Sequence, residues 1–474
     1  MPSIKINFLY KSALTVSTYV IGFITFPYIT RVLGVENIGI VNYIDNLTNY
    51  FLLFATMGIS ILGVREISSA GQNNKLRNKV FSNILGLNLI FTFIILAIYL
   101  LSVEFIVELQ PYKELLYIGI GKIFFTVLLV EWLYTGLEEF RYIAIRSIAI
   151  KLLYVVAVFI LIKSPEDYKL YFALTVGTII LNAIINIFYA LRFIHINIYD
   201  LLSIRYLKEN FTLGSYLILN SMYSTFNVVF LGLTTNNIQV GYYTTAFKLY
   251  SIILAFFSAF TSVMLPRMNA LISQNDKREF NRLIKNSFSV VYSFCIPLIL
   301  FAMIMASDII YVMAGDGYEQ AIIPMMIIMP AVFMVGVSQI LAVQIITPLK
   351  KDKILLLASI SGAALGISLN ILLVPRFQSI GTAITLLCSE TVVTIVYLGY
   401  VLYNKIVAIS FQTILKSILY SLPSIVVCLL ATLFIDNHYW SLCTGFILGG
   451  GLWLAINYHA SSSPIKSIIS GLVK

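Results

Sequence analysis

Residues 31–50, RVLGVENIGIVNYIDNLTNY, join one hydrophobic stretch to the next and set the organisation of the whole chain. A shifted copy, LGLTTNNIQVGYYTTAFKLY, occupies residues 231–250 and also joins two hydrophobic stretches. Without a gap, the copies share residues at these positions: Leu33 and Leu233, Asn37 and Asn237, Ile38 and Ile238, Tyr43 and Tyr243, Tyr50 and Tyr250. A repeat of this length predicts a chain built from two similar halves.

The composition indicates a membrane protein. Of the 474 residues, 59% are hydrophobic and only 11% are charged, whereas soluble domains carry roughly 25% charged residues. A membrane span needs about 20 mainly apolar residues, and the sequence supplies such stretches repeatedly. The alternating pattern of a membrane barrel is absent, so the spans are expected to be helices. The sequence therefore predicts an all-α integral membrane protein.

The apolar stretches predict about 14 transmembrane helices. Together with the repeat, they predict two pseudosymmetric six-helix lobes, residues 1–191 and 213–403. A cytoplasmic linker, 192–212, would join them, and 404–474 would hold two further helices and a cytoplasmic tail. The expected spans are 12–33, 40–64, 81–101, 115–135, 148–163, 169–191, 213–234, 241–265, 287–306, 322–346, 354–374, 380–403, 414–435 and 441–459.

The placement of the basic residues predicts the orientation. The net charge is +10, but most of the cations fall in alternate loops, which disfavours nucleic acid as a partner. The opposite loops hold only Arg31, Lys113, Lys163, Lys169 and Arg376. Short loops rich in Lys and Arg stay in the cytoplasm, so both termini are expected inside. The first apolar run is interpreted as a span and not as a removable signal peptide.

Polar residues form stripes on the first two spans of each half. A polar group facing lipid is costly, so such a stripe points to protein or water on that side. The alternative is hydrogen bonding between packed helices. The striped positions are Thr15, Thr18, Gly22 and Thr25; Asn42, Asp45, Asn46 and Asn49; Asn220, Ser224 and Asn227; and Lys248, Ser251, Ser258 and Ser262.

Two of the charges within spans lie at related positions of the two halves. Asp45 and Lys248 are expected to contribute to an outer gate or to substrate contact. Snorkelling of each side chain to the outer headgroups is the alternative. Lys122 has no obvious local partner, which makes it a candidate contact for an anion.

The acidic residues within spans are candidates for coupling to an ion. Glu390 lies near the middle of the membrane and is the best candidate for a group that takes up a proton, with Asp45 and Glu131 as further candidates. Glu131 and Lys151 lie at similar depth, so a structural ion pair between them is expected.

Other residues predict structure or movement. Pro27 is expected to bend span 1, and Arg31 and Gly34 complete the set of gate or hinge candidates. All four cysteines fall in apolar spans without metal-ligand spacing, so we expect packing roles, no metal site and no cofactor. These residues are Cys295, Cys388, Cys428 and Cys443.

The first hairpin contains Arg31-x-Leu33-Gly34 followed by Gly39, and the next span ends with Gly58-x-x-x-x-Gly63-x-Arg65-Glu66. These motifs resemble the opening of the polysaccharide transporter or O-unit flippase family, which belongs to the multidrug/oligosaccharidyl-lipid/polysaccharide exporter superfamily. The resemblance implies two six-helix lobes around a central cleft lined by spans 1, 2, 7 and 8. It also implies alternating access that moves an undecaprenyl-pyrophosphate-linked oligosaccharide, the repeat unit of O-antigen, capsule or exopolysaccharide, to the outer leaflet of the bacterial inner membrane.

The resemblance implies a transporter and not an enzyme, with membrane lipids, H⁺ or Na⁺, and glycan polymerase or chain-length machinery as partners. Four alternatives stay open at this point. A multidrug exporter is disfavoured by the hairpin motif, and a lipid II flippase by the few cations in the expected cleft. A glycan polymerase or ligase is disfavoured by the short outer loops. A scaffold without transport would give no reason for matched polar stripes.

Overall fold

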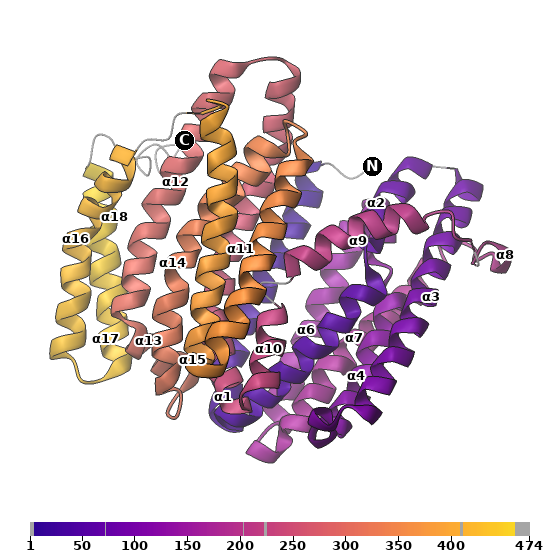
Figure 1. Cartoon of the computed structure of the whole chain (residues 1–474), viewed down its shortest axis with the longest axis horizontal. Coiled ribbons are helices and arrows are strands. Elements are labelled where there is room, and N and C mark those ends of the chain that lie inside the picture. Colours follow the sequence, from indigo (N-terminus) through magenta and orange to yellow (C-terminus); the bar gives the residue numbers. More distant parts are fainter. Residues whose placement is uncertain (1–3, 72, 202, 222–224, 408–410, 460–474) are drawn as a thin grey trace. The chain divides into compact units, whose positions relative to one another are not determined.

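A computed structural model describes residues 4–71, 73–201, 203–221, 225–407 and 411–459. Every regular element in these ranges is a helix (Figure 1). Ten helical segments among the described residues are long and apolar enough to cross a membrane. The prediction of an all-α membrane protein is therefore confirmed.

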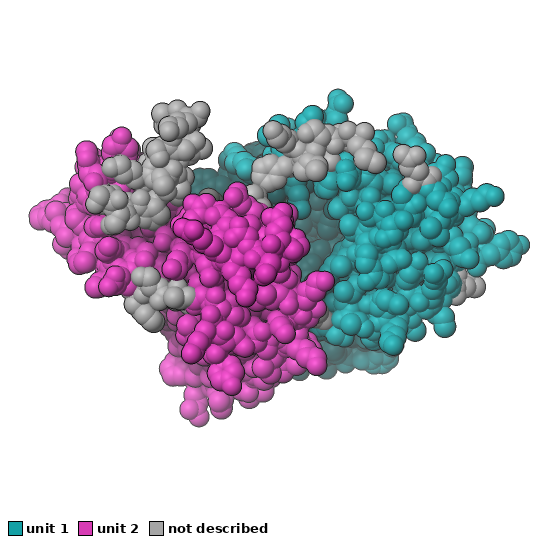
Figure 2. All heavy atoms as spheres, turned by 90° about the horizontal axis from the view of Figure 1, so that it is seen from above, with its two compact units in different colours: residues 1–241 teal, residues 242–474 magenta. Residues whose placement is uncertain are grey.

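The chain divides into two compact units, residues 1–241 and 242–474, which are coloured separately in Figure 2. The lobe boundaries expected from the sequence stay predictions. Helix α11 (Asn237–Ser273) begins in unit 1 and continues into unit 2. The other helices of unit 1 are α1 (Ile4–Thr56), α2 (Ile59–Ala70), α3 (Asn74–Phe105), α4 (Lys113–Thr126), α5 (Glu131–Gly136), α6 (Phe140–Leu161), α7 (Tyr168–Ala190), α8 (Ile198–Leu201), α9 (Leu207–Ser221) and α10 (Thr225–Thr234).

Unit 2 contains the remaining long helices. A π-helical segment, Ile340–Ile346, continues α14, and a second one, Gly445–Gly449, joins α17 to α18. The helices are α12 (Lys277–Ile304), α13 (Ala306–Ala314), α14 (Ile322–Gln339), α15 (Asp352–Tyr403), α16 (Phe411–Phe434), α17 (His438–Thr444) and α18 (Gly450–His459).

Two of the long helices each contain two of the predicted spans. Within α1, Gly34 has φ 75° and ψ 169°, a conformation that essentially only glycine adopts, and it breaks the helix where the sequence predicts a turn. Within α15, Gln378 with φ 49° divides the helix between the predicted spans 354–374 and 380–403. Breaks in the backbone therefore make two helices of each ribbon.

The two copies of the repeated hairpin pack against each other through glycines within unit 1. A Cβ atom on Gly39 would lie 1.7 Å from the Asn237 carbonyl oxygen, and one on Gly241 would lie 2.3 Å from the Val35 carbonyl oxygen. Only residues without a side chain allow this approach. The Tyr112 hydroxyl donates a hydrogen bond to Asn237 Oδ1 at 3.0 Å and so ties the second copy to the loop before α4.

Several expected boundaries are wrong. The span expected over 40–64 ends at Thr56, because Met57 with φ 38° stops the helix and α2 starts a new one. Helix α6 begins at Phe140 and not at 148, which brings Arg146 from an expected loop into a helix. The expected outer loop 308–319 contains most of α13. The span expected over 213–234 is represented by α9 and α10.

A buried core in unit 1 fixes the short helix α5. Phe81 of α3 packs on Trp132 with ring centroids 5.2 Å apart. Leu133 and Tyr134, the next two residues, are fully buried. Burial of these large apolar side chains holds α5 in place, and it thereby sets the position of Glu131 at the start of the helix.

Candidate substrate-binding sites

The amide side chains of the second half of α1 form a half-buried polar row. Asn42 Nδ2 donates to the Ile38 carbonyl oxygen at 2.9 Å, and Asn46 Nδ2 donates to the Asn42 carbonyl oxygen at 2.8 Å. Each of these bonds uses one of the two hydrogens of its amide group. Such groups suit hydrogen bonding to sugar hydroxyls.

Asp45 on the same helix forms an ion pair with Lys122 of α4. Lys122 Nζ lies 2.5 Å from Asp45 Oδ1, and Asn49 Nδ2 donates to Asp45 Oδ2 at 3.1 Å. The Lys122 side chain is only 8% exposed, compared with 27% for Asp45. The expectation that Lys122 lacks a local partner is therefore wrong. The structure brings Asp45, Asn49 and Lys122 together, and Lys122 has its charge balanced within the protein.

A second charged cluster lies at the end of unit 1 where α1 begins. It consists of Glu131, Arg146 and Lys151. Arg146 Nη2 lies 2.8 Å from Glu131 Oε1 and 2.8 Å from Ser147 Oγ. The Arg146 side chain is 5% exposed and also donates to Asn186 Oδ1. The prediction that Glu131 pairs with Lys151 is wrong, because Arg146 takes that place.

Lys151 instead donates to the Thr18 hydroxyl, with 2.5 Å between Nζ and Oγ1. This contact lies in a pocket of about 430 Å³, which we call the polar pocket. Thr15 and Thr18 belong to the stripe predicted for span 1, so that stripe faces this pocket. The lining residues are Leu14, Thr15, Thr18, Tyr19, Leu129, Glu131, Ser147, Lys151, Ile179 and Asn182.

The backbone beside the polar pocket is strained. Val130 separates the end of α4 from α5 and has φ 40°, a left-handed conformation that β-branched residues rarely adopt. The interruption leaves the Leu129 carbonyl outside a regular helix, and Asn186 Nδ2 donates to it at 2.5 Å. A helix broken at membrane depth and stabilised by side chains is a common feature of transporter binding sites.

The other predicted site residues are in both units. Asn227 of α10, in unit 1, is fully buried. In unit 2, Lys248 is half-buried and Ser251 Oγ donates to its carbonyl oxygen at 2.7 Å. Ser224 and the Asn220 side chain lie outside the described residues. The assignment of these residues to a substrate cleft stays a prediction.

Glu390 of α15 is the most deeply placed carboxylate among the predicted residues of unit 2. Its residue exposure is 8%, and within the described parts of the chain no side chain donates a hydrogen bond to its carboxylate. Isolated burial strongly disfavours a charged carboxylate. This environment suits a group that carries a proton.

The hinge candidates lie together on α1. Pro27 is accommodated inside the helix, and Arg31 Nη1 donates to its carbonyl oxygen at 2.8 Å. Gly34 follows at the break described above. The three residues thus form one continuous segment at the end of the first span.

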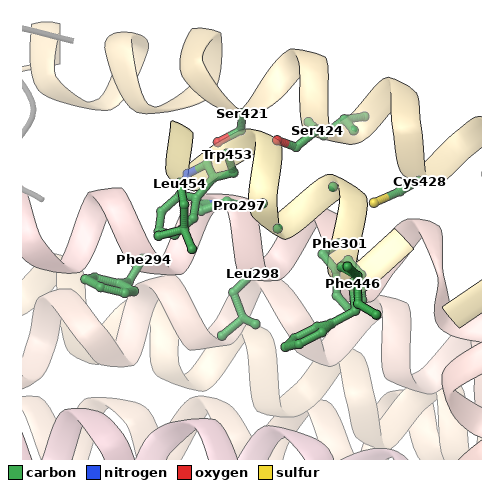
Figure 3. Close-up of a pocket in the computed structure, with 15 residues that line it drawn as sticks. Phe294, Pro297, Leu298, Phe301, Ser421, Ser424, Cys428, Phe446, Trp453 and Leu454 are labelled. Carbon is green, nitrogen blue, oxygen red and sulfur yellow. The ribbon is translucent and has the colours of Figure 1, made fainter. Parts of the chain in front are cut away.

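Unit 2 contains a pocket of about 450 Å³ with an almost entirely apolar lining, which we call the apolar pocket. Helix α12 contributes one wall and helices α16 and α18 contribute the other (Figure 3). Sequence reasoning missed it, because the lining comes from helices distant in the chain. It is lined by Phe294, Pro297, Leu298, Phe301, Ser421, Ser424, Ile425, Cys428, Phe446, Ile447, Gly449, Gly450, Gly451, Trp453 and Leu454.

Comparison with known proteins places this helical fold. The model of the family described as "Polysaccharide biosynthesis protein" matches residues 4–272, more than half of the chain. The chain belongs to this family. It is 24% identical over 420 residues to a protein of Escherichia coli (strain K12) named "Putative O-antigen transporter", and the match covers 85% of this chain and 98% of that protein.

This chain shares its fold with solved structures of transporters. The lipid II flippase MurJ in an inward closed conformation matches with a TM-score of 0.76 at 17% identity, covering 95% of this chain and 98% of that one. An inward-facing multidrug resistance MATE transporter of the MOP superfamily matches with a TM-score of 0.61 at 13% identity, covering 85% and 95%. The likeness in fold supports the all-α membrane fold class expected from the sequence.

Proposed function

We propose that this protein is a flippase for an undecaprenyl-pyrophosphate-linked oligosaccharide, the repeat unit of O-antigen, capsule or exopolysaccharide. It moves this lipid from the inner to the outer leaflet of the bacterial cytoplasmic membrane by alternating access. Membership of the polysaccharide biosynthesis family, in a chain with the fold of flippases and exporters, carries the proposal. Both termini are in the cytoplasm in this proposal, as the basic loops predict.

The proposed substrate cleft uses the polar faces of both halves. Asn42, Asn46 and Asn49 provide amide groups for sugar hydroxyls, and the Asp45–Lys122 pair holds this row in a polar setting. Residues 1–191 and 213–403 are proposed as the two moving lobes. The corresponding residues from the second repeat are proposed to contribute from the other lobe: Asn220, Ser224, Asn227, Lys248 and Ser251.

The apolar pocket is proposed to bind the prenyl chain of the substrate. A long isoprenoid requires contact with apolar surface, and this pocket offers it within membrane-spanning helices. Partners in this proposal are membrane lipids and the glycan polymerase and chain-length machinery that use the translocated unit.

Coupling to an ion gradient is proposed to run through Glu390. We expect Glu390→Gln to leave substrate binding intact and to remove the dependence of transport on a proton gradient, because the amide cannot release a proton. Transport in vesicles with and without a pH gradient measures this, with Ser389→Ala at the neighbouring buried position as the control. Unchanged gradient dependence in Glu390→Gln would direct attention to Asp45, to Glu131 or to Na⁺.

Deletion of the gene in its host tests the proposed function directly. The expected result is the accumulation of complete lipid-linked repeat units on the cytoplasmic side of the membrane. Single repeat units already outside but not joined would identify a polymerase instead. Normal surface glycan and no lipid-linked intermediate would contradict the flippase proposal.

A further inference from the structure

We propose that the polar pocket of unit 1 is a binding site for a phosphate-type anion, with Lys151 Nζ and the Thr18 hydroxyl as its contacts. The ligand is a pyrophosphate, either free or attached to a prenyl chain. Its identification with the pyrophosphate of the transported lipid rests on the proposed function. The site itself rests on the geometry and charge of the pocket.

The charges around the pocket do not balance. Arg146 is neutralised by Glu131 in a direct ion pair. None of the ion pairs among the described residues includes Lys151, whose side-chain partner is the neutral Thr18 hydroxyl. One positive charge therefore remains at the pocket, where it can pair with a bound anion.

Lys122 of the same unit, in contrast to Lys151, has its charge balanced by an ion pair. Its side chain is only 8% exposed, whereas Lys151 is half-buried, and Asp45 Oδ1 lies 2.5 Å from the Lys122 ammonium. No pocket is needed to explain that lysine. The contrast indicates that the counter-ion of Lys151 comes from outside the chain.

The walls of the pocket are held by a network of buried donors. Arg146 binds both Glu131 and Ser147, which line the pocket, while its Nε is buried without a partner in the described parts of the chain. Asn186 supports the same arginine and the Leu129 carbonyl. This network fixes the Glu131 and Ser147 side chains of the wall, while the Thr18 hydroxyl holds the Lys151 ammonium.

The backbone strain at Val130 also supports a functional role for the pocket. Strain of this type is retained where the surrounding structure gains function from it. Here it interrupts the chain between Leu129 and Glu131, two residues that line the pocket. The break turns α5 so that the Glu131 side chain joins the pocket wall.

The size and chemistry of the pocket favour a pyrophosphate over other ligands. A volume of about 430 Å³ falls within the range of small-molecule sites. A metal cation would be repelled by Lys151, and a neutral sugar gains little from an unpaired ammonium. Phosphate oxygens accept short, charge-assisted hydrogen bonds from ammonium and hydroxyl donors.

Binding to the purified full-length protein in nanodiscs tests the site. The probes are inorganic pyrophosphate and farnesyl pyrophosphate, with farnesol as the uncharged control, and calorimetry measures the dissociation constants. We expect Lys151→Gln to weaken both pyrophosphates by at least about tenfold, because a charge-assisted contact is lost. Lys151→Arg should recover most of the affinity, since it keeps the charge.

The matched control is Lys163→Gln in the loop after α6, where the lysine Nζ donates to the Phe159 carbonyl oxygen and lies 5.9 Å from the centroid of the Tyr28 ring. This variant should bind both probes like the wild type. Thermal unfolding and size-exclusion profiles verify that all variants fold. Equal affinity in wild type and Lys151→Gln, or no pyrophosphate binding to the wild type, overturns the proposed site.

The same measurements separate this inference from the proposed function. Lys151-dependent binding of pyrophosphate by a protein that does not translocate lipid-linked glycan supports the site and contradicts the flippase. Translocation with full activity in Lys151→Gln supports the flippase and overturns the site. Lys151-dependent binding of inorganic pyrophosphate but not farnesyl pyrophosphate supports an anion site and identifies its ligand as a soluble anion.

Discussion

The polar pocket of unit 1 and the apolar pocket of unit 2 have nearly equal volumes, about 430 and 450 Å³, but opposite linings. One contains Lys151 and Glu131, and the other is walled by side chains such as Phe294 and Trp453. A lipid pyrophosphate has a charged head and a long apolar chain, and each pocket suits one of these parts. The comparison teaches that polarity, and not volume, assigns ligand chemistry to the two sites.

The largest effect, a loss of stability, is expected where a buried charge is balanced by a partner within the protein. Asp45→Ala leaves the buried Lys122 ammonium without a counter-charge and should destabilise the fold by about 3 kcal/mol. Thermal unfolding in detergent measures the loss. The double variant Asp45→Asn, Lys122→Met should recover most of the stability, because no charge remains buried. Additive losses in the double variant would show that the pair is not coupled and would weaken the contrast with Lys151.

Lys151→Gln should separate function from stability. It removes a charge that no ion pair among the described residues balances and that contacts the neutral Thr18 hydroxyl. Stability should therefore change by less than about 1 kcal/mol, while export of lipid-linked glycan falls about tenfold. Complementation of a deletion strain, together with the unfolding temperature, measures both quantities. A large loss of stability would place Lys151 in the same structural class as Lys122.

Filling the apolar pocket should affect the prenyl chain and not the anion. Gly450 lines this pocket and has open space around its would-be Cβ, so Gly450→Phe is expected to fit while occupying part of the volume. Affinity for a long-chain prenyl pyrophosphate should fall several-fold, whereas that for inorganic pyrophosphate stays unchanged. Gly399→Phe, another open position outside the pocket, is the control. Equal losses for both probes would remove the distinction between the two pockets.

The smallest effect is expected at Glu131 and has the opposite sign. Glu131→Gln keeps a hydrogen-bond acceptor for Arg146 but removes the negative charge from the polar pocket. Pyrophosphate should then bind about two- to fivefold more tightly, because exposed charges interact weakly through solvent and Glu131 is half-exposed. Titration calorimetry at two salt concentrations checks this, since salt should reduce the gain. Weaker binding would indicate that Glu131 contacts the ligand directly.

The sequence predicted the class of fold well because span length and apolar character are strong local signals. The break at Gly34 falls between the predicted spans 12–33 and 40–64, where a glycine and a polar hairpin already marked the turn. Boundaries were less accurate where a helix continues through polar residues. Helix α6 begins at Phe140, in a segment with too many charges to look like a span.

The ion pairs could not be predicted from the sequence, because they depend on the geometry of helix packing. Asp45 and Lys122 are 77 residues apart, and their contact depends on how α1 and α4 are rotated about their axes. The error over Glu131 has the same origin, because similar depth suggested Lys151 while helix rotation selected Arg146. The i,i+4 contact from Asn49 to Asp45 is the one polar link of this set that helical spacing alone could have predicted.

The most direct measurement uses the purified protein in sealed vesicles that contain a lipid-linked oligosaccharide with its glycan on one known side. A glycan-cleaving enzyme added to the other side reports how much of the glycan has crossed the membrane. The proposed function predicts rapid cleavage that depends on the protein, and the anion site proposed for the polar pocket predicts much slower cleavage with Lys151→Gln. Protection of the glycan at the rate of protein-free vesicles would contradict the assignment as a flippase.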